Sequence, residues 1–142
     1  MLKKQGPADA VTLWFIGVHK ATANTELARH FEIKGDADYR ELVEDAVIEM
    51  AQNALRPGGL LQVAIRGGFP SMREAREHTA SSYEPYFTAH GFRLKSIEAF
   101  TYSEPTGDKA ISVRSASSPQ INALPVYAVS MIGQKGELQQ SA

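Results

Sequence analysis

Two apolar segments separated by an amphipathic helix constrain the fold of this chain more than any other feature. The segment Val11 to Val18 is almost continuously apolar and rich in β-branched and aromatic residues, which is typical of an interior strand covered on both faces. From Tyr39 to Leu55 the apolar residues recur every three or four positions, as on one side of a helix. A second apolar strand follows over Leu60 to Ile65. This alternation indicates an α/β fold with right-handed crossovers.

Turn-forming residues mark the ends of the central helix. Asp36 or Asp38 is expected to cap its first turn with a carboxylate oxygen. The Pro57-Gly58-Gly59 turn is expected to stop the helix, because proline cannot continue it and glycine accepts positive φ. Upstream, a short helix is expected over Glu26 to Phe31.

A pair of helices is expected to follow the second strand. The helical pattern begins at Ser71, and Pro85 is expected to break it, with Ser81 or Ser82 as the cap of a new helix. Gly91 is expected to end this second helix, because glycine commonly follows the last helical residue.

Two further strands complete the predicted sheet. They are expected over Arg93 to Tyr102 and Val126 to Ile132, joined by a long loop at 103–124 that is rich in serine and proline. Because this linker has no helical pattern, the two strands can be antiparallel neighbours. Residues 1–142 are therefore expected to form one domain with about four strands, an N-terminal arm at 1–10 and a flexible tail at 134–142.

The composition excludes several classes of function. Fifteen basic and sixteen acidic residues give a formal charge of -1, so we expect neither a nucleic-acid partner nor a membrane partner. The absence of cysteine excludes disulfides, zinc ribbons, iron–sulfur clusters and thiol nucleophiles. The four histidines are scattered, and we expect no metal site. The apolar runs are too short to span a membrane, so a cytoplasmic location is expected.

Several segments together resemble class I S-adenosylmethionine-dependent methyltransferases. Asp9 to Trp14 and the later run Ala54-Leu55-Arg56-Pro57-Gly58-Gly59 before a hydrophobic strand resemble the fourth strand, the following helix and the fifth strand of that family. Tyr83 to Gly91 resembles its helix that ends in a His-Gly-Phe turn, and the last two predicted strands resemble its sixth and seventh. The resemblance implies a partial Rossmann-like sheet whose last strand inserts antiparallel between the two before it. It also implies S-adenosylmethionine as the cofactor.

The resemblance covers only the second half of the family's fold. The family binds its cofactor chiefly at the first two strands, through a Gly-x-Gly-x-Gly turn and an acidic residue, and neither can be placed here. We therefore expect either a truncated half-domain or a partner that supplies the rest. A strand at 11–18 without its usual neighbours would leave an unpaired hydrophobic edge, which predicts a homodimer joined through this strand. A complementing chain is the other expectation.

The loop after the first strand is one candidate site, because ligands of open α/β sheets bind beyond the carboxyl ends of parallel strands. Gly17 and Val18 are candidate cofactor contacts, and the resemblance places this region beside cofactor and acceptor. His19 is a candidate general base, since its ordinary pKa lies near neutrality. The plainer interpretation of His19 is a loop histidine bonded to nearby backbone. Trp14, inside the apolar strand, is expected to be core rather than a stacking platform.

The loop after the second strand is the other candidate site, for substrate. Arg66 could clamp a carboxylate or phosphate, although a solvated or salt-bridged arginine is the plainer interpretation. Gly67 and Gly68 could admit a ligand close to the backbone or could simply form the turn, and Phe69 could stack on a planar ligand. Two functions follow: a methyltransferase-like unit, or a non-catalytic module that binds a partner or small ligand on the same sheet.

Overall fold

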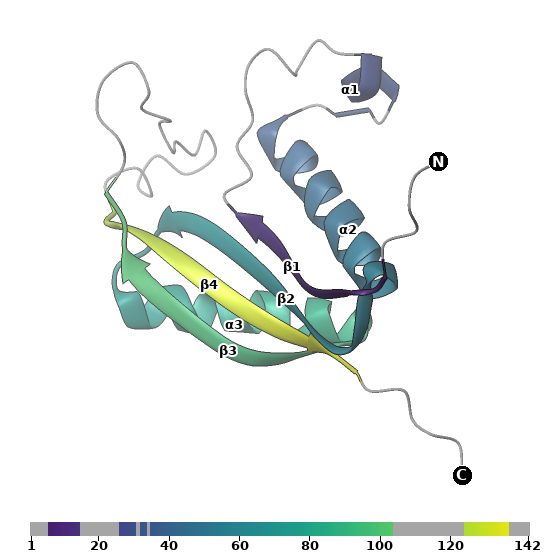
Figure 1. The fold of residues 1–142 in the computed structure, drawn as a ribbon. Helices are drawn as coiled ribbons and strands as arrows, with labels where there is room; N and C mark the ends of the chain where they lie inside the picture. Colours follow the sequence, from purple (N-terminus) through teal and green to yellow (C-terminus); the bar gives the residue numbers. More distant parts are fainter. Residues whose placement is uncertain (1–5, 15–25, 31, 34, 104–123, 137–142) are drawn as a thin grey trace.

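A sheet of four strands with helices packed on one face forms the body of the protein (Figure 1). The computed structural model describes residues 6–14, 26–30, 32–33, 35–103 and 124–136. The predicted loop at 103–124 therefore falls almost entirely outside the described residues. The elements, in chain order, are β1 (Ala8–Trp14), α1 (Glu26–His30), α2 (Asp36–Ala54), β2 (Leu55–Gly68), α3 (Met72–Ala89), β3 (Phe92–Thr101) and β4 (Val126–Lys135).

The strand order is β1-β2-β4-β3. β1 runs parallel to β2, while β4 is antiparallel to both of its neighbours. The last strand therefore inserts between its two predecessors, and β1, β2 and β3 all point the same way. This confirms the predicted fold class, a partial Rossmann-like α/β sheet with an antiparallel last strand and helices packed on it.

The Pro57-Gly58-Gly59 turn lies inside β2 and does not separate the helix from the strand as predicted. α2 has already ended at Ala54, and Leu55 is extended and buried in the core. Gly58 adopts a φ of +76°, and the pairing of the two strands is irregular here. The turn is thus a bulge within the strand, for which glycine supplies the positive φ. The strand starts earlier than predicted because burial of Leu55 holds it against the helices.

The predicted start of α2 differs from the structure, whereas the predicted end of α3 agrees with it. The N-cap of α2 is Gly35, without a side-chain hydrogen bond, so the predicted cap at Asp36 or Asp38 was wrong because both residues are already helical. Gly91 follows α3 with a φ of +78°, which confirms the predicted end.

α3 continues through Pro85 without the predicted break. Ser81 and Ser82 both donate their hydroxyls to the carbonyl oxygen of His78, so neither caps a new helix. Proline costs the helix one backbone donor. Phe87, immediately beyond, is fully buried, and its packing holds the last turns of α3 on the sheet.

The core lies between one face of the sheet and the two long helices. It is formed by Ile48, Ala51, Leu55, Leu61, Val63, Phe87, Phe92 and Met131. These residues come from α2, α3 and three strands, so both helices cover the same face. Trp14 points to the other face and is 62% exposed, which corrects the prediction that it is core. β1 has one covered face because no described helix lies over the second.

β4 extends three residues beyond the predicted end at Ile132, so Gln134 and Lys135 belong to the sheet and not to a flexible tail. Lys135 Nζ donates to the carbonyl oxygens of Gln52 and Leu55, the latter at 2.6 Å. A lysine at these carbonyls stabilises the end of α2. At the other end of the chain, β1 begins at Ala8, inside the predicted arm. Among the described residues, no helix is both long and apolar enough to cross a membrane.

Candidate functional site

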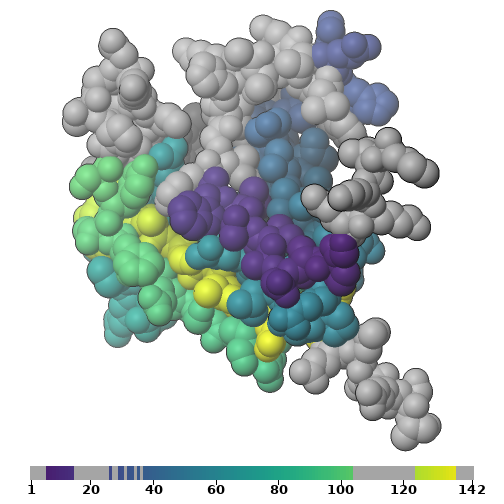
Figure 2. Space-filling model, viewed as in Figure 1, coloured from purple at the N-terminus to yellow at the C-terminus, as the bar shows by residue number. Residues whose placement is uncertain are grey.

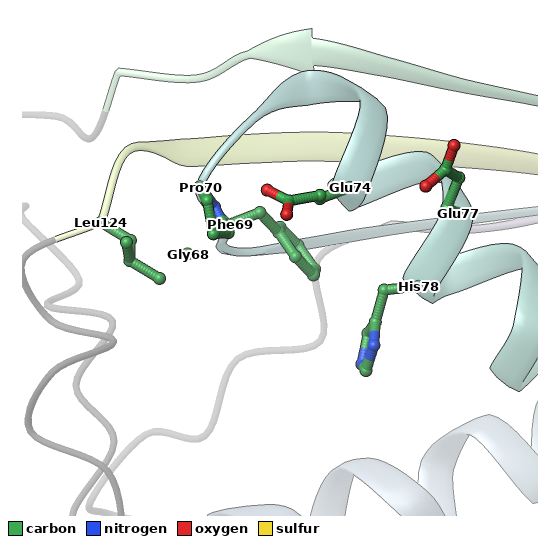
Figure 3. A pocket seen from close by; sticks show the side chains of 7 residues that line it. All are labelled: Gly68, Phe69, Pro70, Glu74, Glu77, His78 and Leu124. Carbon is green, nitrogen blue, oxygen red and sulfur yellow. The ribbon is translucent and has the colours of Figure 1, made fainter.

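A hollow of about 480 Å³ opens at the carboxyl end of β2 (Figure 3). This is the end of the parallel strands at which open α/β sheets bind ligands. The lining comes from the end of β2, the segment that leads into α3, the first turns of α3 and the segment just before β4. It consists of Gly68, Phe69, Pro70, Glu74, Glu77, His78 and Leu124.

The start of α3 positions the charged side of the hollow. Ser71 is the N-cap, and its Oγ accepts a hydrogen bond from the Glu74 backbone N–H at 3.2 Å. The same hydroxyl donates to Glu74 Oε2 at 3.2 Å, which holds the Glu74 carboxylate at the rim. Glu77 and His78 follow one helical turn later, and Arg73 lies 3.8 Å from Glu77 across the helix surface.

Phe69 forms the apolar wall. Its backbone N–H donates to the carbonyl oxygen of Pro125 at 3.0 Å, which ties the end of β2 to the start of β4. Its ring centroid lies 5.8 Å from that of His78, and Figure 3 shows the ring between Leu124 and His78. The ring folds back over Gly67, where an added Cβ would lie 3.0 Å from Phe69 Cε2. The absence of a side chain at Gly67 therefore lets the ring adopt this position.

The chemistry of the hollow combines an aromatic face with two carboxylates. Such a lining suits a ligand with an apolar or planar body and a cationic or hydrogen-donating group. Within the part of the chain that the structure describes, no three His, Asp or Glu side chains are grouped so as to hold a metal ion.

The structure separates the four predicted substrate residues. Gly68 and Phe69 line the hollow and Gly67 lies beneath the Phe69 ring. Arg66 belongs to the other face of the sheet, where it donates to Tyr102 Oη at 3.4 Å and lies over the Tyr102 ring.

The remaining predicted site residues, Gly17, Val18 and His19, lie outside the described residues. Conversely, the lining residues Glu74, Glu77 and His78 were not among the site residues predicted from the sequence. The one local signal was the Ser71-x-x-Glu74 spacing, which is typical of a capping box and places the glutamate at the start of a helix.

Shifted pKa values occur at the contact between α2 and α3, away from the hollow. Tyr83 donates its hydroxyl to Glu44 Oε2 at 2.9 Å, and Tyr86 donates to Asp45. Burial is the main cause that raises the pKa of Glu44, and it also raises the pKa values of both tyrosines well above their ordinary value. These pairs fix α3 against α2.

No protein-family profile and no curated protein sequence matches this chain. Among solved structures, the chain is similar to a mutant of the 16S rRNA (adenine(1408)-N(1))-methyltransferase from Catenulisporales acidiphilia, crystallised with its cosubstrate SAM. The identity is 14% and the TM-score 0.47, and the match covers 95% of this chain and 56% of that enzyme. The chain thus spans about half the length of the protein it matches.

Proposed function

We propose that this chain corresponds to the second half of a methyltransferase-like fold and takes part in methyl transfer from S-adenosylmethionine. One observation carries the proposal: the antiparallel strand β4 lies between β2 and β3, which share one direction. This strand order is the arrangement that the sequence resemblance implied for the last strands of the family. It supports the proposal independently of any sequence identity.

In this proposal, the carboxyl ends of β1 and β2 form two sides of the site. S-adenosylmethionine would supply an electrophilic methyl group to a nitrogen or oxygen of the acceptor, with its demethylated product as the leaving group and a proton lost from the acceptor. Gly17 and Val18 contact the cofactor, and His19 accepts the proton. Gly68 and Phe69 hold the acceptor in the hollow, whose aromatic and carboxylate lining fits a polar organic molecule. Positioning the two molecules supplies most of the rate.

Calorimetric titration with S-adenosylmethionine and with its demethylated product tests the proposal. We expect saturable binding that is weakened in Gly17→Val and unchanged in Met50→Ser, which alters an exposed residue on α2. If saturating cofactor gives neither heat nor a thermal shift, the methyltransferase proposal is wrong. The chain is then a non-catalytic module that binds a partner or small ligand on the same sheet.

Among the described residues, the outer edge of β1 has no neighbouring strand, which supports a homodimer as the working form. In natural proteins, bulges and charged residues on an edge strand prevent the sheet from pairing with another chain. The outer edge, β3, has both, since its pairing is irregular between Leu94 and Ser96 and the exposed Lys95 lies there. β1 carries no charge between Ala10 and Trp14. Its one charged residue, Asp9, is near one end, so antiparallel pairing of two copies keeps the two Asp9 side chains apart.

Light scattering at micromolar concentration distinguishes the assemblies. We expect a dimer mass for the unmodified chain and a monomer mass for Thr12→Lys and for Thr12→Glu, because each places like charges together at the pairing edge. Mixing the two variants should restore a dimer. Ser96→Lys, on the opposite edge, is the matched control and should remain dimeric. A monomer mass for the unmodified chain would refute the homodimer, and co-purification of a second polypeptide would indicate a complementing chain.

A further inference from the structure

The face of the sheet opposite α2 and α3 carries large apolar side chains in contact with solvent. Trp14 on β1, Leu60 on β2 and Phe100 on β3 are 62%, 40% and 51% exposed. The residues that alternate with them, such as Leu61 and Ala99, point into the core. Figure 2 shows this face, on which side chains of all four strands are visible, and Figure 1 shows α3 behind the strands.

Among the described residues, the connections between the strands leave this face uncovered. β1 passes through α2 to β2, and β2 passes through α3 to β3, both in the same direction along the sheet. Right-handed crossovers that advance in one direction place their helices on one face. Sheets built on such crossovers are normally covered on both faces. A cover for the second face therefore has to come from elsewhere than α2 and α3.

We call the strip of this face between Trp14 on β1 and Phe100 on β3 the trough. In register, Trp14 is level with Ala64, Ser130 and Glu98, and Phe100 is level with Ala128 and Arg66. The small residues Ala64, Ala128 and Ser130 therefore lie on the two strands between the rings. Three strand spacings of about 4.8 Å separate the two walls by roughly 14 Å. An α-helix with its side chains is about 10–12 Å wide. The trough is thus wide enough for one helix.

The polar groups on the floor of the trough already have partners. The Trp14 indole Nε1–H donates to Gln62 Oε1 at 3.1 Å, and Gln62 Nε2 donates to Ser130 Oγ at 2.9 Å. An apolar cover over these groups leaves their hydrogen bonds intact, so it does not incur the cost of burying polar atoms without partners. This arrangement favours burial of the floor.

The charges on this face favour an acidic occupant. Arg93 lies near the start of β3, and Arg66 lies near the end of β2, where it donates a hydrogen bond to Tyr102. Glu98 lies on β3 at a level of the sheet between the two arginines. A helix with carboxylates at its two ends would be complementary to the two arginines. Within the part of the chain that the structure describes, a second copy offers no such helix, since the exposed residues of α2 and α3 are largely charged or polar.

We propose that the trough between Trp14 and Phe100 binds one amphipathic α-helix of a partner protein, with an apolar stripe on the Ala64 and Ala128 floor and acidic residues near Arg66 and Arg93. This surface is separate from the hollow at Phe69. The inference stands whether or not the chain binds S-adenosylmethionine.

Trp14 is the chain's single tryptophan, so its fluorescence reports directly on the trough. The probe is a synthetic peptide of about 18 residues, a length at which isolated helices become stable, with a leucine and alanine stripe, glutamates at both ends and no tryptophan. We expect a saturable blue shift of the Trp14 emission. Phe100→Ser and Ala128→Arg should weaken binding at least tenfold, while Met72→Ser, which alters an exposed apolar residue on α3, should not change it.

Four results would overturn the proposal. The first is no shift with the glutamate-flanked peptide at millimolar concentration. The second is equal binding of a lysine-flanked or a scrambled peptide. The third is a blue shift of the free chain that disappears on dilution, which would show that a second copy covers the face. The fourth is quenching of Trp14 by a single-stranded oligonucleotide in preference to the peptide, which would assign the aromatic side chains to base stacking.

Discussion

Thr79 on α3 is buried against the sheet at 1% exposure, and its Oγ1 has no hydrogen-bond partner among the described residues. A helical threonine usually returns its hydroxyl to the carbonyl one turn earlier. Ser82 and Thr88 of the same helix do so, bonding to the carbonyl oxygens of His78 and Glu84. Thr79 therefore keeps a polar atom in the core without compensation.

Replacing Thr79 by valine should stabilise the protein. A buried hydroxyl without a partner costs about 1–3 kcal/mol relative to an apolar group of the same shape. Valine and threonine have similar helix propensities, so the substitution adds no large backbone cost. We expect the free energy of unfolding to rise by about 1–2 kcal/mol. The melting temperature should rise by roughly 3–8 °C, on the order expected for a domain of this size.

Urea unfolding, followed by circular dichroism and by Trp14 fluorescence, measures this change. The midpoint should increase while the slope with denaturant stays constant, because the surface exposed on unfolding is the same. Thr88→Val is the matched control: its hydroxyl is exposed and bonded at 2.8 Å, so the stability should change little or fall. Equal or lower stability of Thr79→Val would refute the reasoning and would indicate that a buried water or another acceptor bonds Oγ1.

Three further predictions concern the helix contact and the core. Burial raises the pKa of Glu44, so the folded state keeps the Glu44 proton to a higher pH than the unfolded state does. The free energy of unfolding should therefore fall as pH rises from about 4.5 through the folded pKa. Glu44→Gln, which can still accept the hydrogen bond from Tyr83, should remove this part of the pH dependence in urea titrations. The pKa of Tyr83 is raised, so above about pH 10 the unfolded tyrosine ionises while the folded one does not, and the free energy of unfolding should fall. Tyr83→Phe should make the free energy of unfolding less dependent on pH between pH 9 and 11. An alanine Cβ at Gly133 would lie 2.8 Å from Phe87 Cδ2, so Gly133→Ala should destabilise the protein by about 1–3 kcal/mol, as measured by thermal unfolding, with Gly136→Ala as the control.

The parts of the fold predicted correctly from the sequence rest on repeated patterns. The three-and-four spacing from Tyr39 onward predicted a helix, and α2 forms there. The spacing did not identify its buried face, because Ile48 and Ala51 are fully buried while Met50, one of the spaced apolar residues, is exposed. The predicted strand pairing depended on the long linker without helical pattern, which is compatible with antiparallel neighbours. The central position of β4 followed from the resemblance alone. Periodicity shows which face of a strand is buried, but it does not specify which strand lies beside it.

The errors occurred where long-range packing overrides a local preference. Pro85 disfavours a helix interior, yet burial of Phe87 and the contacts of Tyr83 and Tyr86 with α2 keep α3 continuous. The Pro57-Gly58-Gly59 turn is a typical helix stop, yet Leu55 before it is buried and begins the strand. In both cases the deciding interaction joins residues far apart in the sequence, and a local rule contains no information about it.

The candidate site shows the same division between local and long-range information. Gly68 and Phe69 could be selected from the sequence because they follow a strand. Leu124 could not, since it reaches the hollow only because β4 pairs with β2 as far as Gly68 and so brings the residues before β4 to the end of that strand. Arg66 is the converse case: it is adjacent to Gly67 in sequence, but alternation along the strand turns it to the other face, beside Tyr102.

The free edge of β1 and the uncovered face are two consequences of one topological fact. Because the described strands advance in a single direction from β1 through β2 to β3, the described crossover helices cover one face, and β1 keeps one edge without a described neighbour. An antiparallel homodimer through β1 would pair the backbone groups at the edge of that strand. Its two-fold axis would be perpendicular to the sheet, so the uncovered faces of both copies would lie on the same side of one continuous sheet. Such a dimer would carry two troughs, each bounded by its own Trp14. Peptide binding to the dimer should therefore occur with one helix per chain, and a stoichiometry of one helix per two chains would contradict this geometry.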